Sequence, residues 1–371
     1  MPAKVAVVGA GCSGSVAAWR LALAGLAPVV LDRDQQPGAS VACGGVMLHA
    51  LGRWLELPAS LIDGEVTRLW LVDRRRRKRL DCVRPLFVSL DRRRLDCFLA
   101  ERAVACGSEL RSGCRVVDWD PRTGGLTWER AGQRVTETFD TVVFADGQRS
   151  VARRAGLGVG QGTPVGSAFY RELASDDDRC DEIELHLVLP AGVPGYLWVF
   201  PKRGYVQVGV GRLQRPGDLP LRYVLDEFIR DDDRLRLYRP LRAGGGTVPL
   251  TLARRFACPG GLVIGDAAGL VNPVTGGGLL YATSSGELAA RAVTEGFQKG
   301  LDRAWIARRY CGLMRRSVHL WWLRSLGVAF RLQTIGAEGA GSWLPNAVLR
   351  LYARLTPSLA LAAAALARGK G

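Results

Sequence analysis

The chain has 371 residues, of which 48% are hydrophobic and 23% charged, and this composition excludes a disordered or a fibrous protein. The length allows two domains or one elaborated domain. A net charge of +16 suggests acidic partners such as phospholipid headgroups, nucleic acid or an anionic cofactor, but the excess is arginine spread along the whole chain.

Targeting and redox signals are few. The nine cysteines form no C-x-x-C pair and their number is odd, so we expect neither a metal site nor a disulfide framework. A strand expected at residues 4–8 leaves no room for a signal peptide, and the apolar run "SLALAAAALA" is about half of the roughly 20 residues that span a bilayer. We expect a cytoplasmic protein without a nucleic-acid partner, which could attach to the inner face of the cell membrane.

The first predicted strand, Val5–Val8, runs directly into a glycine-rich turn that opens a helix. Gly9, Gly11 and Gly14 form G-x-G-x-x-G, in which the first glycine permits a tight turn, the second admits a pyrophosphate and the third lets helix and strand pack closely. The bare N–H groups at the start of the helix then face the phosphates. Asp32 ends the next strand, where a carboxylate can accept a hydrogen bond from a ribose hydroxyl. Together these features predict a dinucleotide site.

Apolar runs at Val29–Leu31, Val142–Phe144 and Leu262–Ile264 indicate further buried parallel strands, as in a doubly wound, Rossmann-like α/β domain. Between them, "VTRLWLVD", "YLWVFP" and "YVQVGVG" alternate with period two and predict an inserted antiparallel β-sheet domain, and the C-terminal region is helical in character. The run "RRRRKR" is either a solvated hairpin tip or a contact with an anionic membrane. The expected domains are a discontinuous cofactor-binding domain at 1–65, 86–160 and 255–300, a substrate domain at 66–85 and 161–254, and a helical region at 301–371.

A second glycine cluster, "GDAAGLVNPVTGGGL", follows the predicted strand at 262–264. Asp266 can bind sugar-like hydroxyls, and Gly276–Gly278 open another helix with bare N–H groups. A nicotinamide dinucleotide would not need a second such turn, whereas the ribityl chain and flavin ring of FAD would. The two clusters therefore predict one FAD.

With these motifs in this order, the sequence over about residues 1–310 resembles the FAD-dependent family that includes aromatic hydroxylases, flavin halogenases and geranylgeranyl reductases. The segment "DRRRLDCFLAERA" is similar to the family's R-x-x-F-D helix, and "FADGQRS" matches its A-D-G-x-x-S motif. The resemblance implies that Arg92, Asp146 and Gly147 lie at the cofactor.

Two further stretches resemble geranylgeranyl reductases in particular. The segment "ACGGVM" at 42–47 is similar to their C-G-G stretch, in which the cysteine lies near the flavin ring, and "YLWVFPKRG" at 196–204 is similar to their Y-x-W-x-F-P motif. Flavin halogenases instead have W-x-W-x-I-P and a catalytic lysine, for which the five lysines of this chain offer no obvious candidate.

The residues of these two stretches allow more than one interpretation. Alternation along a strand places Tyr196, Trp198 and Phe200 on one face, where they either wall an apolar pocket above the flavin or form plain core. Cys43 could supply or position a proton, line the pocket, or be inert core.

The expected catalytic residues are Cys43, Tyr196 and Trp198, and the expected substrate pocket is formed by Tyr196, Trp198 and Phe200. His49, His186 and His319 have no metal-binding spacing. The expected cofactor-binding residues, among which the Cys12 side chain is expected only to pack, are Gly9, Gly11, Cys12, Ser13, Gly14, Asp32, Arg33, Cys43, Gly44, Gly45, Arg92, Asp146, Gly147, Gly265, Asp266, Pro273, Gly276, Gly277, Gly278 and Leu279.

The resemblance implies saturation of carbon–carbon double bonds in a polyprenyl, geranylgeranyl-type chain, with a hydride from reduced FAD at one carbon and a proton at the other. The alternatives are an FAD-dependent monooxygenase or halogenase acting on an apolar or aromatic small molecule, and a non-catalytic electron carrier. No second nucleotide fingerprint occurs, so either NAD(P)H or a ferredoxin-like protein is expected to reduce the flavin.

A lipid substrate must be collected from a membrane, and the segment "WLPNAVLRLYARL" has the pattern of an amphipathic helix. Leu344, Val348 and Leu351 fall at helical spacing, while Arg350 and Arg354 share another face. Such a helix either lies in the headgroup layer of an anionic membrane or covers the protein's own core.

Overall fold

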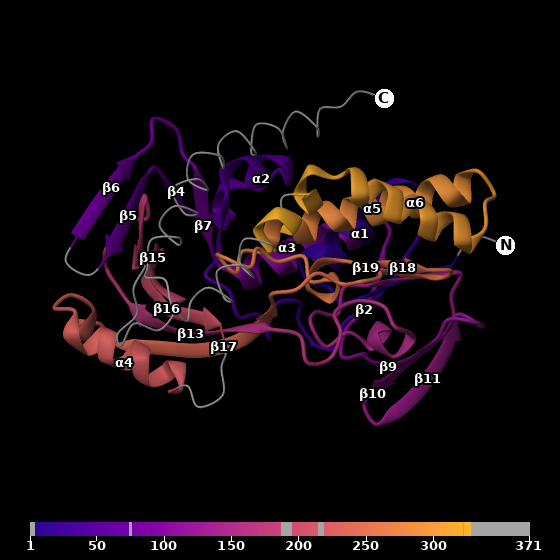
Figure 1. The fold of residues 1–371 in the computed structure, drawn as a ribbon, viewed down its shortest axis with the longest axis horizontal. Coiled ribbons are helices and arrows are strands. Elements are labelled where there is room, and N and C mark those ends of the chain that lie inside the picture. Colours follow the sequence, from indigo (N-terminus) through magenta and orange to yellow (C-terminus); the bar gives the residue numbers. More distant parts are fainter. Residues whose placement is uncertain (1–3, 74–75, 187–194, 214–218, 322, 328–371) are drawn as a thin grey trace. The chain divides into compact units, whose positions relative to one another are not determined.

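The computed structural model describes residues 4–73, 76–186, 195–213, 219–321 and 323–327 (Figure 1). The described chain forms two compact units, each assembled from separate stretches of sequence. Of the described residues, those within 4–41, 93–166 and 247–327 form the first unit, and those within 42–92 and 167–246 form the second. Both sheets and helices occur, as the expected α/β class with an inserted antiparallel sheet requires.

The first unit is built on a six-stranded sheet with the order β18-β19-β12-β1-β2-β8. Its strands are β1 (Val5–Val8), β2 (Val29–Leu31), β8 (Glu109–Arg111), β12 (Thr141–Phe144), β18 (Ala257–Cys258) and β19 (Gly261–Val263). All neighbours pair in parallel except β18 and β19. The central strands β1 and β12 are buried along their whole length, which explains their continuous apolar sequences.

Helices cover one face of this sheet, and a small antiparallel sheet packs on the other (Figure 1). The helices are α1 (Cys12–Leu23), α3 (Arg92–Ala105), α5 (Leu279–Gln298) and α6 (Arg303–Arg316), and the small sheet contains β9 (Arg115–Asp120), β10 (Gly125–Arg130) and β11 (Gln133–Thr138). Trp119 of β9 contacts Phe144 of β12 edge to face, with ring centroids 4.9 Å apart. A Cβ atom at Gly261 would lie 2.3 Å from the Trp119 ring, so this glycine makes room for the second layer.

The second unit contains most of a seven-stranded sheet with the order β17-β13-β16-β15-β14-β5-β6. It is antiparallel apart from the parallel pair β14 and β5. The strands are β5 (Arg68–Asp73), β6 (Arg76–Asp81), β13 (Val165–Ala174), β14 (Glu182–His186), β15 (Gly195–Lys202), β16 (Tyr205–Leu213) and β17 (Pro240–Pro249). One face packs on helix α4 (Leu221–Asp231) through the Leu197, Val199 and Leu225 side chains.

A second, three-stranded sheet completes this unit, in the order β3-β7-β4. Its strands are β3 (Val46–Leu48), β7 (Phe87–Leu90) and β4 (Ile62–Val66), accompanied by α2 (His49–Trp54) and the short 3-10 helices η1 (Ala59–Leu61) and η4 (Leu235–Leu237). The sequence patterns did not predict this sheet. It carries the turn at Cys43–Gly45 directly before β3.

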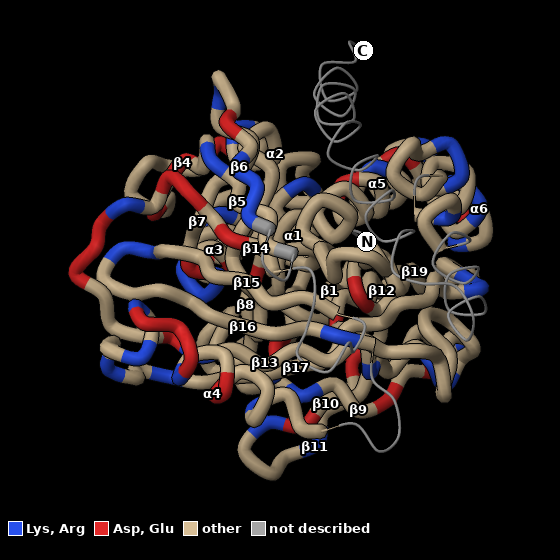
Figure 2. The backbone as a smooth tube through the Cα atoms, turned by 60° about the vertical axis from the view of Figure 1, so that its left-hand side comes forward, with Lys and Arg blue, Asp and Glu red and all other residues tan. Residues whose placement is uncertain are grey.

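Basic residues occur along both units and alternate with acidic ones, so the net positive charge is not gathered in one segment (Figure 2). In the basic hairpin between β5 and β6, Arg77 and Arg79 turn back onto the Trp70 ring, at 3.8 and 5.5 Å from its centroid. In the part of the chain described here, no helix is long and apolar enough to cross a membrane. The amphipathic segment expected at 343–355 lies outside the described residues.

Candidate functional site

The first glycine cluster forms the turn between β1 and α1. Gly9 has φ +100°, and a Cβ there would lie 2.6 Å from the Ala145 carbonyl oxygen. A Cβ at Gly14 would lie 1.9 Å from the Gly9 oxygen, so strand and helix approach too closely for a side chain. Gly11 precedes α1, and a Cβ there would meet no protein atom within 4 Å. The first and third glycines thus serve the fold, while the second borders open space beside bare backbone N–H groups.

Asp32 stands at the end of β2, next to this turn. Its carboxylate accepts hydrogen bonds from the backbone N–H groups of Ala10, at 2.5 Å, and Asp34, at 2.8 Å. Burial raises the pKa of the Asp32 carboxyl, and the two backbone hydrogen bonds oppose this rise. Arg33 is largely exposed beside Asp34, and its charge acts to lower the pKa of both Asp32 and Asp146. The acid is therefore fixed against the glycine turn, as a ribose-binding carboxylate needs to be.

The second glycine cluster meets the first within the same unit. Gly265 opens the short 3-10 helix η5 (Gly265–Ala268) with φ +55°, and a Cβ there would lie 2.7 Å from Ser13 Oγ. Helices α1 and α5 also touch, because a Cβ at Gly286 would lie 2.5 Å from the Ser13 carbonyl oxygen. The Gly265 N–H donates to Ser285 Oγ of α5. One composite site is thus formed from the two distant stretches of sequence.

Two buried polar atoms of this composite site have no hydrogen-bond partner among the residues that the structure describes. Asp146 follows β12, and its Oδ2 accepts from the Val151 N–H, whereas its buried Oδ1 has no hydrogen-bond partner among the described residues. Burial raises the pKa of this carboxyl. Asn272 precedes Pro273 in the second cluster, and its buried Nδ2 likewise has no partner in the described chain. Such groups are costly to bury unless a ligand satisfies them.

Glycines that border space free of protein atoms complete the composite site. Gly147, with φ +77°, and Gly276, with φ +66°, would each accept a Cβ atom without meeting protein within 4 Å. Gly278 precedes α5, whose first residue is Leu279, and the space at Gly278 borders Asp266 Oδ1 at 3.4 Å. Bare N–H groups, orphaned polar atoms and a ribose-type carboxylate fit an extended dinucleotide that carries phosphates and many hydroxyls. The residues of the first unit therefore fit FAD.

Five expected cofactor residues have other roles or lie in the second unit. The Cys12 thiol donates to Asp96 Oδ1 of α3 at 2.8 Å, so its side chain ties α1 to α3, in agreement with the expected packing role. Arg92 is the half-buried first residue of α3 and belongs to the second unit, as do Cys43, Gly44 and Gly45. Their contact with the cofactor remains a prediction.

The second unit contains the aromatic strand. Tyr196, Trp198 and Phe200 lie on one face of β15, with centroids 5.7 Å apart for the first pair and 6.1 Å for the second. The alternation predicted from sequence is confirmed, because Leu197 and Val199 join the core on the opposite face. Trp198 and Phe200 are 5% and 8% exposed within an apolar cluster.

Glycines bring these rings close to the backbone. A Cβ at Gly209 of β16 would lie 2.1 Å from the Trp198 ring, and a Cβ at Gly44 would lie 2.8 Å from the Phe200 ring. The Trp198 ring therefore lies over β16, and the Phe200 ring touches the turn that carries Cys43. The aromatic face and the Cys43 turn were predicted separately from the sequence, and in the structure they are in direct contact.

The structure also adds residues that the sequence analysis did not single out. Lys202, for which no role was foreseen, is 1% exposed, and burial lowers its pKa to about 8 against the attraction of Asp63, Cys43 and Asp91. The chain therefore does contain a buried lysine. Period-two spacing from Phe200 could have placed it on the aromatic face. Asp96 and Asn272 lie within the segments "DRRRLDCFLAERA" and "GDAAGLVNPVTGGGL", and Gln207 lies within the strand pattern "YVQVGVG", but no role was predicted for any of the three.

The three histidines have separate environments. His49 lies 3.3 Å from Glu65 and His186 lies 3.3 Å from Glu184, while burial lowers the pKa of His319. All nine cysteines are free thiols. Within the described ranges, no three side chains are grouped as metal ligands.

Comparison with known proteins agrees with this geometry. Residues 4–86 match the family model described as FAD dependent oxidoreductase. The digeranylgeranylglycerophospholipid reductase 2 of Methanothermobacter thermautotrophicus is 30% identical over 91% of this chain and 90% of its own length. A geranylgeranyl bacteriochlorophyll reductase-like protein of Thermoplasma acidophilum superposes with a TM-score of 0.77 and 25% identity, over 88% of each chain.

A myxobacterial chondrochloren halogenase superposes with a TM-score of 0.67 and 19% identity, over 85% of this chain and 79% of its own, which shows a shared fold. The reductase relative, by contrast, matches in sequence along nearly the whole of both proteins. This chain therefore belongs to the geranylgeranyl reductase family of FAD-dependent oxidoreductases.

Proposed function

We propose that the protein reduces carbon–carbon double bonds of a polyprenyl, geranylgeranyl-type chain. The observation that carries this proposal is the face of β15 on which Tyr196, Trp198 and Phe200 stand in a row beside the Cys43 turn. A row of aromatic side chains on one strand suits the wall of a pocket for a long, flexible and apolar substrate. The Methanothermobacter relative is named for a lipid that carries such chains.

Bound FAD, when reduced, supplies the hydride for one alkene carbon. The other carbon needs a proton, and an isolated alkene has no carbonyl group to hold the developing charge. The protein must therefore position the chain and exclude water. We assign the supply or positioning of the proton to Cys43, and the positioning of the substrate to Tyr196, Trp198 and Phe200.

The source of electrons and the place of action are further parts of the proposal. NAD(P)H or a ferredoxin-like protein would reduce the flavin. An isoprenoid carried on a lipid would be reached from the cytoplasmic face of an anionic membrane. Arg315 and Arg316 at the end of α6, together with the 63% exposed Trp321, support attachment in the headgroup layer.

A second candidate function is oxygen-dependent monooxygenation or halogenation of an apolar or aromatic small molecule. Buried Lys202 favours it, because flavin halogenases resemble this chain in motif order and use a catalytic lysine. Against it, the Lys202 ammonium group is already engaged by two carbonyl oxygens, at 2.9 and 3.0 Å.

Two measurements test the proposal. Mass spectrometry of lipids from cells with and without the protein should reveal products that are heavier by about 2 mass units per reduced bond, since a hydride and a proton are added. Turnover of a geranylgeranyl lipid by the chemically reduced holoprotein should also proceed without oxygen. Strict dependence on oxygen would instead identify the monooxygenase or halogenase alternative.

A further inference from the structure

Two long polar side chains are buried beneath the turn at Cys43–Gly45, and neither has a part in the alkene reduction proposed above. Lys202 ends β15 and is 1% exposed, and Gln207 lies on the neighbouring strand β16 and is 4% exposed. Both point to the aromatic face, because Gln207 pairs with Phe200 and Lys202 follows Phe200 by two residues on the same strand. Burying such groups is costly unless they make specific contacts.

Lys202 binds the backbone at the end of the turn. Its Nζ donates to the carbonyl oxygen of Gly45 at 2.9 Å and to that of Leu90 at 3.0 Å. The Gly45 N–H in turn donates to Cys43 Sγ at 3.4 Å. The Lys202 ammonium group and the Cys43 sulfur therefore bind the same residue, Gly45, the first at its carbonyl oxygen and the second at its N–H group.

The backbone of Gly45 has little conformational freedom. Gly45 has φ +65°, and a Cβ there would lie 2.1 Å from the Leu90 oxygen and 3.0 Å from Lys202 Nζ. The Leu90 N–H also donates to the Gly45 oxygen, at 2.8 Å. The turn is thus held against β7 in a backbone conformation that glycine adopts readily.

Gln207 binds the start of the same turn. Its Nε2 donates to the Cys43 carbonyl oxygen at 3.2 Å, and its Oε1 accepts from Trp198 Nε1 at 3.3 Å. One amide therefore connects the aromatic face with the backbone of Cys43. The turn is fixed at both ends, by Gln207 at Cys43 and by Lys202 at Gly45.

We propose that Lys202 and Gln207 are positioning residues that fix the turn carrying the Cys43 thiol, by binding the backbone carbonyl oxygens of Gly45 and Cys43. The catalytic consequence rests on the proposed function of Cys43, but the positioning itself does not. Around Lys202 stand Asp63 of β4, Asp91 before α3 and Cys180 before β14, and Cys180 in turn faces Asp178 and Arg203.

The test measures the reactivity of Cys43 itself in the full-length holoprotein without substrate. Iodoacetamide alkylation is followed by peptide mass spectrometry, with Cys82 and Cys258 as internal references. In Lys202→Met, we expect the Cys43 rate, relative to the rates of Cys82 and Cys258 in the same sample, to change about threefold or more, because the anchor at the Gly45 carbonyl oxygen is lost. In Gln207→Leu, we expect a change of about threefold or more in the same ratio, because the anchor at the Cys43 carbonyl oxygen is lost.

Lys78→Met removes another lysine from the same unit and should leave the Cys43 rate unchanged. Equal Cys43 rates in the parent, Lys202→Met and Gln207→Leu, with unchanged circular dichroism, would overturn the proposal. If Lys202→Met does not fold, Lys202→Gln keeps a hydrogen-bond donor on a shorter side chain and should change the Cys43 rate by a smaller factor. If the changes in rate occur in a protein that reduces no alkene, the positioning stands and the proposed function fails.

Discussion

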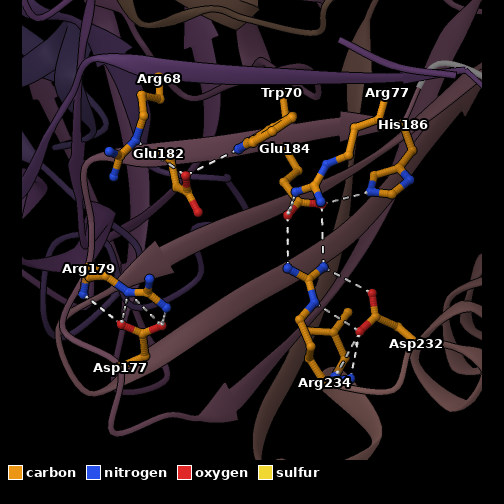
Figure 3. Close-up of polar contacts among 11 residues, drawn as sticks. Arg68, Trp70, Arg77, Asp177, Arg179, Glu182, Glu184, His186, Asp232 and Arg234 are labelled. Atoms are coloured by element: carbon orange, nitrogen blue, oxygen red, sulfur yellow. Dashed lines mark hydrogen bonds and ion pairs between the residues drawn. The ribbon is translucent and has the colours of Figure 1, made fainter. Parts of the chain in front are cut away.

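Two charged side chains are buried on opposite faces of the seven-stranded sheet, and they are stabilised in different ways. Glu184 of β14 accepts from Arg77 and Arg234, each at 3.0 Å, and lies 3.3 Å from His186 (Figure 3). Lys202 of β15 donates to two neutral carbonyl oxygens. The Glu184 carboxylate is surrounded by opposite charges, whereas the Lys202 ammonium group is stabilised mainly by backbone carbonyl dipoles.

The pKa values report this difference. Burial alone would raise the pKa of the Glu184 carboxyl. Hydrogen bonds from His186 and Arg234, together with the charges of Arg234 and Arg77, outweigh this effect and lower the pKa to about 2. Burial lowers the pKa of Lys202 to about 8, and the attraction of Asp63 compensates only in part. Glu184 therefore stabilises the charged folded state, whereas Lys202 costs stability. A residue kept at such a cost is a candidate for function.

The largest expected effect is on stability, in Glu184→Gln. Loss of the carboxylate should lower the free energy of unfolding at pH 7 by about 3 kcal/mol, since the folded pKa near 2 lies below the ordinary 4.5. This contribution is complete above pH 4.5 and disappears as the pH falls towards 2. Urea unfolding of parent and variant from pH 7 to pH 3 should therefore give curves that converge in acid.

Glu182→Gln is the matched control, because Glu182 lies on the same strand with a side chain that is 30% exposed. Its pair with Arg68 at 3.4 Å should contribute less than about 1 kcal/mol. If Glu184→Gln and Glu182→Gln lowered the free energy of unfolding equally, burial of the carboxylate would not explain its contribution to stability.

Cys43→Ala should lower alkene reduction about 100-fold while FAD remains bound, because the thiol is assigned to the proton. Cys82→Ala, which removes another half-buried thiol of the second unit, should reduce substrate at the parent rate. Steady-state rates under anaerobic conditions and flavin absorbance measure the two properties. A Cys43→Ala variant with the parent rate would leave Cys43 as pocket lining.

Gly11→Val extends the comparison to the glycine turn of the first unit. Since a Cβ there meets no protein atom, the variant should fold, but its side chain should occupy cofactor space and weaken FAD binding at least about tenfold. Gly14→Val should instead lower the unfolding temperature of the apoprotein, because its Cβ would clash with the Gly9 oxygen. Flavin fluorescence titration and thermal unfolding separate the two outcomes. Full FAD occupancy in Gly11→Val would contradict the assignment.

The smallest expected effect, opposite in sign to that of Glu184, is in Lys202→Met. The unfolded chain binds the lysine proton up to about pH 10.5, whereas the folded chain releases it near pH 8, so parent stability should rise with pH across this window. Lys202→Met should lack that rise and be more stable at pH 7 by about 1–2 kcal/mol, since lost carbonyl contacts offset part of the gain. Urea unfolding at pH 7 and pH 10 measures both. Destabilisation at pH 7 would show that Lys202 serves the fold.

The sequence predicted those parts of the protein that depend on local pattern. The glycine turn, the buried parallel strands and the alternation of Tyr196 and Trp198 follow from periodicity and backbone geometry, and all three are present. The roles of Lys202 and Gln207 could not be predicted, because they depend on which distant backbone carbonyl lies beneath each side chain. The three-stranded sheet of β3, β7 and β4 was missed for the same reason: its strands are short and pair across long loops.

The contact between Ser13 and Gly265 has a consequence for how the protein matures. β12 and β19 complete the sheet beside β1, so the first unit needs strands from three separate stretches of chain. During synthesis from the N-terminus, the early glycine turn must wait until the later segment leaves the ribosome before the composite site can close. Non-local assembly of this kind is slow, and the incomplete sheet exposes strand edges on which chains aggregate. Supply of flavin during expression should therefore raise the yield of folded protein by capturing chains at the moment when the last strand docks.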